Sequence, residues 1–315
     1  MRLHTAVTQY ITYRKSLGEC FLTNETILKR FAREIGAKTN LSEVKSEFVD
    51  TFLSGTGPIT SNWHGKYQAL LGFYRYALSR GHVKNSPLPT AIPKRPQPFV
   101  PYVYDVKELQ ALLDASLTYQ KNRSHIRPKT IRSLLLLLYG TGLRIQEALS
   151  LTLADVNFPQ KLLTIHKTKF RKSRLVPIGD ELVQGLSKYN RYRHEKKFSQ
   201  KPEDPFFINR RGGSLNRDSV EAIFQRIREK AGIRRSDGAR YQPRLHDLRH
   251  SFAVHRLTTW YQEGADVQQL LPVLSVYLGH TYLAATSTYL TMTPTLLEEA
   301  GRRFENYAIK AVCHD

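Results

Sequence analysis

The chain has 315 residues, of which 41% are hydrophobic and 10% aromatic, enough to form two domains with sizeable cores. Lysine and arginine number 48 against 27 aspartate and glutamate, and this net charge of +21 favours a polyanionic partner. The longest apolar run, 134–139, is too short to span a membrane, and the N-terminus lacks a signal-peptide pattern, so we expect a cytoplasmic, nucleoid-associated protein with no membrane partner.

The first part of the chain predicts a small basic helical domain over residues 1–86. Apolar residues recur at helical spacing over 3–17, 27–35, 44–53 and 63–78, with lysines and arginines on the opposite faces. Asn24 or Thr23 is expected to cap the second helix, and Gly36 to end it. Residues 87–103 are rich in proline and have no apolar period, so they predict an extended linker.

A second domain is expected over residues 104–315. Asp105 and Glu108 have the spacing of a capping box and predict the start of a helix. Further helices are expected over 131–139, from Arg144 to 151, over 182–194, over 214–231 and through most of the remaining chain. The apolar runs 162–165 and 175–178, joined by a basic turn, predict a β-hairpin, and 205–209 predicts a short strand. The fold class is therefore mainly α with a small antiparallel β-sheet.

Six residues of this second domain have the chemistry that phosphodiester cleavage needs: Arg144, Lys169, His246, Arg249, His280 and Tyr289. Two guanidinium groups bind the non-bridging oxygens of a phosphate and stabilise the charge of a pentavalent state, and a tyrosine hydroxyl is a possible nucleophile. His246 and Arg249 project from the same face of one helix, and Arg144 begins another. His280 and Tyr289 flank a turn and a short helix, so we expect them to share a site.

Each residue alone also has an ordinary interpretation, since an arginine after a glycine turn fits a solvated helix start. His246 and His250, four residues apart, suit a metal pair, but no third ligand follows at a sensible spacing. Cys20 and Cys313 lie near opposite ends of the chain and give no ligand spacing either. We therefore expect no metal and no cofactor.

Four segments carry a resemblance to a known family: GTGLRIQEALSL, TKFRKSRLVPI, RLHDLRHSFAVH and YLGHTYLAATSTYL. They resemble, in order, the signature segments of the tyrosine recombinases, or phage integrase family. The resemblance covers the chain from about residue 104 onward. It implies an α+β catalytic domain there, and the N-terminal helices are similar in size and position to the family's core-binding domain.

The resemblance also implies a role for each residue. Arg144 and Arg249 would bind the scissile phosphate, and Lys169 would protonate the leaving 5′ oxygen. His246 would accept or shuttle the tyrosine proton, and His280 would hydrogen-bond a phosphate oxygen. Tyr289 would be the nucleophile. The choice of Lys169 over Lys167 or Lys172 depends on aligning the hairpin on 174–177, so the alternatives stay open.

The implied function is site-specific recombination of the integrase or transposase type, serving a mobile genetic element. It would proceed through a 3′-phosphotyrosyl intermediate, without metal or ATP. The expected partner is double-stranded DNA, and the expected assembly is a homotetramer on two sites, with a monomer or weak oligomer when free. Two alternatives remain: a nickase similar to type IB topoisomerases, and a non-catalytic DNA-binding regulator with the same fold.

Two further features concern the end of the chain. The segment 265–278 is about one helical turn longer than the family pattern and contains Pro272, which is expected to affect how His280 and Tyr289 are presented. Residues 295–312 predict an amphipathic helix, which would pack on its own domain or dock into a neighbouring protomer.

Overall fold

A computed structural model describes residues 1–36, 38–55, 57, 59–96, 100–119, 124–166, 173–239, 241–291, 298 and 301. Lys169 and its alternatives Lys167 and Lys172 lie outside the described residues, as does the helix predicted over 295–312 apart from 298 and 301. The chain forms two compact units, Met1–Phe99 and Val100–Asp315. Their boundary falls within the proline-rich segment, and the finer limits expected from the sequence stay a prediction.

The first unit is a bundle of helices: α1 (Leu3–Ser16), α2 (Leu22–Ile35), the 3₁₀ helix η1 (Leu41–Glu43), α3 (Ser46–Ser54) and α4 (Ser61–Ser79). Helix α4 packs against the other three α-helices. Gly72 allows its close approach to α1, because a Cβ there would lie 2.7 Å from the hydroxyl of Tyr10. Helix α2 begins at Leu22 without a side-chain cap, so the cap predicted at Asn24 or Thr23 is wrong.

The second unit contains α5 (Val106–Thr118), α6 (Pro128–Thr141), α7 (Ile145–Leu149), α8 (Asp180–Glu195), α9 (Arg217–Lys230), α10 (Asp247–Gln262), α11 (Val267–Leu278), α12 (Ala284–Ser287) and the 3₁₀ helix η2 (Thr288–Thr291). Helix α6 is central and packs against α5, α8 and α10. The buried leucines of α6 belong to the main apolar core of this unit. The capping box of Asp105 and Glu108 at the start of α5 is confirmed.

Three strands form one antiparallel sheet in the order β1-β2-β3: β1 (Val156–Asn157), β2 (Leu162–Ile165) and β3 (Arg174–Pro177). Leu163 pairs with Val176, and Ile165 pairs with Arg174. Leu163, Ile165 and Val176 are buried, so one face of the sheet packs on the core while the other is partly exposed. The mainly helical fold with a small antiparallel sheet is thus confirmed.

The strand predicted over 205–209 is wrong. Pro205 and Ile208 make only isolated bridges, to Thr152 and Ser214. Phe206, Phe207 and Ile208 are all buried in succession, and both phenylalanines pack against the ring of Tyr189. The backbone of this run bonds two separate segments instead of one partner strand: the N–H of Phe206 donates to the carbonyl of Leu151, and the N–H of Asn209 donates to that of Gly213.

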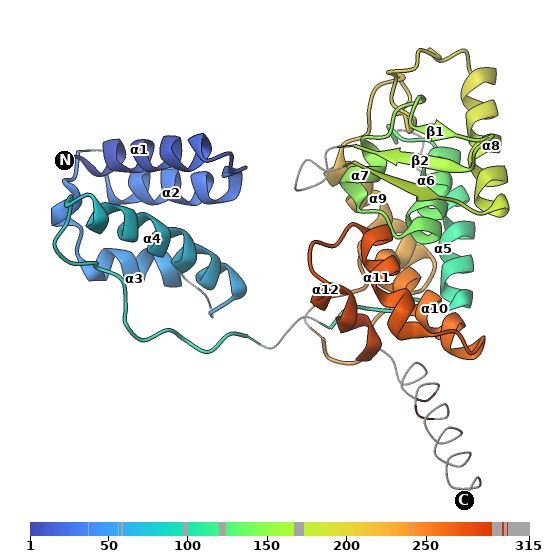
Figure 1. Cartoon of the computed structure of the whole chain (residues 1–315). Coiled ribbons are helices and arrows are strands. Elements are labelled where there is room, and N and C mark those ends of the chain that lie inside the picture. Colours follow the sequence, from blue (N-terminus) through green and yellow to red (C-terminus); the bar gives the residue numbers. More distant parts are fainter. Residues whose placement is uncertain are drawn as a thin grey trace, which may run out of the picture. The chain divides into compact units, whose positions relative to one another are not determined.

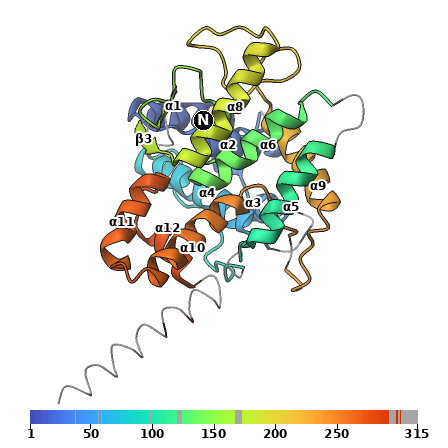
Figure 2. The same ribbon diagram turned by 90° about the vertical axis from the view of Figure 1, so that its right-hand side faces the viewer.

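Helices α10, α11 and α12 gather on one side of the second unit (Figure 1, Figure 2). They enclose a small apolar cluster of their own, which includes Phe252, Leu274, Leu278 and Tyr289. Helix α11 continues through Pro272, which is exposed, so the proline does not interrupt the helix before its end at Leu278. Among the described residues, no helix has the length and apolar character that crossing a bilayer requires.

Candidate active site

The turn between α6 and α7 brings the first arginine into the site. Gly142 ends α6 in a left-handed conformation (φ 61°), and its N–H donates to the carbonyl of Leu138. A Cβ at Gly142 would lie 2.6 Å from Phe252 and 2.9 Å from Leu278, so this position requires glycine on both counts. Arg144 follows in an extended conformation as the N-cap residue of α7, whose first residue is Ile145.

Arg144 reaches from this turn to the end of α11. Its Nη1 donates to Glu147 Oε1 at 2.9 Å, and its Nη2 donates to the carbonyl of Gly279 at 3.0 Å. A longer bond of 3.4 Å joins Nη1 to the carbonyl of Leu278. The side chain stays 36% exposed, so its guanidinium is accessible to a ligand.

Helix α10 supplies the second arginine. Arg249 is buried, and its two terminal nitrogens donate to the carbonyls of Gly142 at 2.6 Å and Leu278 at 2.8 Å. Burial and the nearby Arg144 lower the pKa of Arg249 to about 10, which still leaves it cationic at neutral pH. Its charge also acts on Tyr289, whose pKa it lowers against the effect of burial.

The start of α10 is fixed by a fully buried carboxylate. Asp247 accepts from the backbone N–H of Arg244 at 2.8 Å and from its guanidinium at 3.0 Å. The hydroxyl of Ser251 donates to the carbonyl of Asp247 and accepts from the backbone N–H of Tyr104. These bonds hold the helix start, and with it His246, Arg249 and His250.

Two imidazole rings pack against the tyrosine, and a third lies beside one of them. The rings of His250 and His280 lie 5.5 Å and 6.0 Å from that of Tyr289, and the rings of His246 and His250 lie 5.0 Å apart. His280 is oriented by a 2.7 Å hydrogen bond between its Nδ1 and the hydroxyl of the buried Thr286. His246 faces solvent on one side, but the protein packed around its other side removes enough water to perturb its titration.

The charges of this site define its protonation state at neutral pH. Desolvation, followed by neighbouring arginines and histidines, lowers the pKa of His246, His250 and His280 to about 4 each. All three are therefore neutral at pH 7 and able to accept a proton. Burial raises the pKa of Tyr289 despite the opposing charges of Arg249 and Arg144, so this side chain is a neutral phenol until a base takes its proton.

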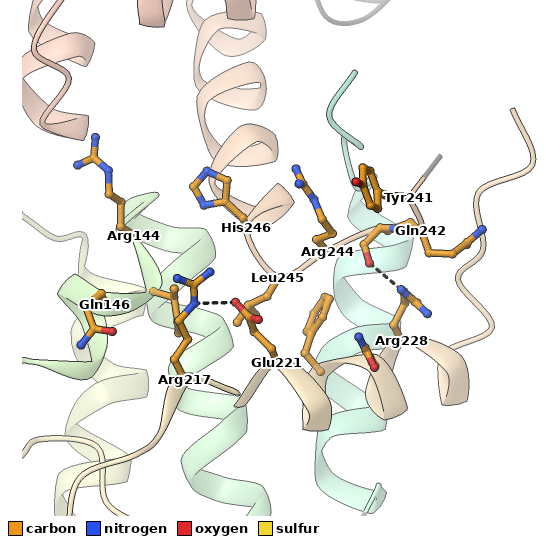
Figure 3. A pocket seen from close by; sticks show the side chains of 14 residues that line it. Arg144, Gln146, Arg217, Glu221, Arg228, Tyr241, Gln242, Arg244, Leu245 and His246 are labelled. Carbon is orange, nitrogen blue, oxygen red and sulfur yellow. Dashed lines mark hydrogen bonds and ion pairs between the residues drawn. The ribbon is translucent and has the colours of Figure 1, made fainter. Parts of the chain in front are cut away.

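A cavity of about 810 Å³ opens beside Arg144 and His246. Helix α9 and the segment 241–246 form its other walls, and most of its charged side chains are cationic. Figure 3 shows Arg217 and Glu221 of α9, joined by an ion pair, together with Arg144, Arg244 and His246 around this space. Its cationic lining suits a polyanion.

The structure thus brings together five of the six residues chosen from the sequence: Arg144, His246, Arg249, His280 and Tyr289. The sequence reasoning missed three others that touch them. Glu147 bonds Arg144, Arg174 bonds Glu147, and His250 lies between His246 and Tyr289. His250 was weighed only as half of a metal pair, and no three His, Cys, Asp or Glu side chains of the described chain are grouped to hold a metal ion.

Comparison with known proteins identifies the family. Residues 103–295 match the sequence profile of the phage integrase family. The chain is also 34% identical over 303 residues to the putative integrase/recombinase y4rB of Sinorhizobium fredii, covering 95% of this chain and 96% of that protein. The chain belongs to the phage integrase family. It is therefore a tyrosine recombinase, an enzyme of site-specific DNA recombination.

Two other proteins illustrate the range of this family. The tyrosine recombinase XerD of Corynebacterium glutamicum is 32% identical over 231 residues, covering 73% of this chain and 70% of that protein. The structure of a lambda integrase tetramer bound to a Holliday junction matches with a TM-score of 0.64 and 16% identity, over 90% of this chain and 78% of that one, which supports the fold. The nickase and the non-catalytic regulator, left open by the sequence, gain no support from these relatives.

Proposed function

We propose that this tyrosine recombinase cuts and rejoins duplex DNA through a 3′-phosphotyrosyl intermediate on Tyr289. The observation that carries the proposal is the position of Tyr289, which packs against the rings of His250 and His280 and lies within reach of the charges of Arg249 and Arg144. A nucleophile, a phosphate-binding pair and proton acceptors at one point are the parts that phosphodiester transfer requires.

In the proposed reaction, the Tyr289 oxygen attacks phosphorus and the bond from phosphorus to the 5′ oxygen breaks. Arg144 and Arg249 stabilise the negative charge of the pentavalent state, and His280 donates a hydrogen bond to a phosphate oxygen. His246 takes the tyrosine proton, either directly or through His250, whose ring lies between those of His246 and Tyr289. Lys169, assigned by the family resemblance alone, protonates the leaving 5′ oxygen, which departs as a 5′ hydroxyl.

The second half of the reaction reverses the first on another strand. The phosphotyrosyl bond keeps the energy of the broken phosphodiester, so a 5′ hydroxyl can displace Tyr289 without ATP. We propose that a homotetramer brings two duplex sites together for this exchange. Support comes from the lambda integrase tetramer bound to a Holliday junction, whose fold the chain shares.

The decisive test is covalent capture. The protein would be incubated with nicked duplexes of two kinds: a pool of randomised sequence, and duplexes tiled across the DNA that flanks its own gene. We expect a detergent-resistant adduct that mass spectrometry locates at Tyr289, and the captured duplex then serves as the substrate for later assays. An adduct on another residue, or none from any duplex, would overturn the proposal.

A further inference from the structure

Arg174 is a buried arginine of β3 to which neither the sequence nor the proposed reaction gives a function. Its side chain is 10% exposed. Its Nη1 and Nη2 donate to the two oxygens of Glu147 at 3.1 and 2.8 Å, and its Nε donates to the carbonyl of Tyr277 at 3.0 Å. The guanidinium thus joins the sheet to α7 and to the end of α11.

Glu147 is shared between Arg174 and Arg144. Its Oε1 accepts from Nη1 of Arg144 at 2.9 Å, and its Oε2 accepts from the backbone N–H of Arg144 at 3.1 Å. Each carboxylate oxygen therefore takes one bond from each arginine residue. Because Arg174 occupies both oxygens, Glu147 bonds only one nitrogen of the Arg144 guanidinium.

We propose that Arg174 is a positioning residue for the phosphate-binding Arg144 and acts on it through Glu147. This inference rests on the proposed function. A carboxylate readily takes an arginine in a two-pronged arrangement. Without Arg174, Glu147 would bond both terminal nitrogens of Arg144 and withdraw the donors that the phosphate needs. With Arg174 in place, the guanidinium of Arg144 stays partly exposed beside the cavity.

A close backbone approach supports the same arrangement. Gly279 has φ +70°, and a Cβ there would lie 2.6 Å from Nη1 and 2.8 Å from Cζ of Arg174. The absence of a side chain at Gly279 lets Arg174 lie against the turn from which His280 follows. This close fit and the bond to the carbonyl of Tyr277 hold the Arg174 guanidinium in place on Glu147.

The charge of Glu147 provides a readout specific to this coupling. Its burial acts to raise its pKa, but the hydrogen bonds and charges of Arg174 and Arg144 outweigh burial and leave the pKa below its usual value. The charged groups that face it are Arg174, Arg144 and, at longer range, Arg249. Removing Arg174 should therefore raise the pKa of Glu147 and shift any dependence on its ionisation to higher pH.

The test compares Arg174→Gln, Glu147→Gln and the double variant in single-turnover cleavage of the captured duplex. We expect Arg174→Gln to lower the cleavage rate about 100-fold, the effect of a small misplacement of a catalytic group, with little change in DNA affinity. In wild type the histidines set the fall of the cleavage rate near pH 4, and in Arg174→Gln this fall should begin at higher pH because Glu147 then takes up its proton earlier. The double variant should cleave no more slowly than Glu147→Gln alone. Its cleavage rate should not show the fall at higher pH that is expected of Arg174→Gln, because it has no carboxylate at 147. Arg174→Lys should rescue poorly, because an ammonium cannot make both bonds to Glu147.

Arg193→Gln is the matched control, because Arg193 is also buried but belongs to α8 and touches none of the site residues. Arg193→Gln should lower the melting temperature without changing the pH at which the cleavage rate falls on acidification. If the losses of Arg174→Gln and Glu147→Gln multiply in the double variant, Arg174 does not act through Glu147. The proposal is also overturned if the cleavage rate of Arg174→Gln falls on acidification at the same pH as that of wild type.

A readout without catalysis separates this inference from the proposed function. A carboxylate with a lowered pKa stabilises the folded protein above its unfolded pKa, and this stabilisation is lost as the pH falls through the folded pKa. The melting-temperature difference between wild type and Glu147→Gln should therefore shrink on acidification, and shrink at higher pH when Arg174 is absent. If no duplex is ever captured but this pattern holds, the reaction is wrong and the coupling stands. If the melting-temperature difference caused by Glu147→Gln depends on pH in the same way with and without Arg174, Arg174 does not act on Glu147.

Discussion

Arg249→Lys tests whether the site needs a planar guanidinium that donates to two acceptors, or only a positive charge. Arg249 donates to carbonyls on two different elements, Gly142 at 2.6 Å and Leu278 at 2.8 Å. A lysine has one nitrogen and cannot hold both carbonyls in this arrangement. One buried carbonyl left without a donor costs about 1–3 kcal/mol of unfolding free energy. Losing one preorganised donor to the transition state costs about 2.7–4 kcal/mol, or roughly 100- to 1000-fold in cleavage rate.

The assay pairs denaturant unfolding with single-turnover cleavage of the captured duplex. Because lysine keeps the charge, the dependence of DNA affinity on salt should stay unchanged, so the loss appears in the chemical step alone. Arg193→Lys provides the control for replacing a buried arginine away from the site. Cleavage by Arg249→Lys at a rate near that of wild type would refute the requirement for two donors, and a changed salt dependence would show that Arg249 acts mainly in binding.

Three other outcomes test the remaining roles. Tyr289→Phe should bind the captured duplex but form no adduct. If this variant still forms an adduct, the nucleophile is another side chain. Lys169→Ala should cleave a substrate with a 5′-thio leaving group almost as well as wild type, because a thiolate leaves without protonation; rescue of Lys172→Ala instead would reassign the acid. Since the pKa of His246, His250 and His280 is lowered to about 4, kcat/KM should hold from neutral pH to well below 6 and fall only near pH 4. A fall centred near 6.5 would contradict this.

Local signals were enough to predict most of the helices and the hairpin. The capping box at Asp105 and the glycine end of α2 at Gly36 depend on residues a few positions apart, and both were readable from the sequence. β1 was missed because two residues are too few to show a period of two. The apolar run 205–209 shows the opposite error, since residues buried on every side resemble a core strand without forming one.

The site residues divide in the same way. Arg144, His246, Arg249 and His280 stand in short motifs, so residue type and order were enough to choose them. Glu147 and Arg174 gave no such signal, because their importance arises from contacts between β3, α7 and α11 that are distant in the sequence. The carboxylate of Glu147, three residues after Arg144, was the local sign of this arrangement, but its spacing is also that of an ordinary helix capping box.

The end of α11 explains how cations that repel one another remain at one point. The last carbonyls of a helix lack partners within it and carry partial negative charge. Here Arg174 bonds the carbonyl of Tyr277, Arg249 bonds that of Leu278, and Arg144 bonds that of Gly279.

The chain that leaves this helix end carries His280 and then Tyr289. One set of carbonyls therefore fixes Arg144, Arg249 and the start of the segment that bears Tyr289, the groups to which the proposed reaction gives phosphate binding and nucleophilic attack. Pro272 lies upstream on the exposed side of α11, and the contacts at the helix end are all made. A shift of the last turn of α11 would move the arginines and the tyrosine together, which is the physical reason to expect substitutions there to affect phosphate binding and nucleophile position as a unit.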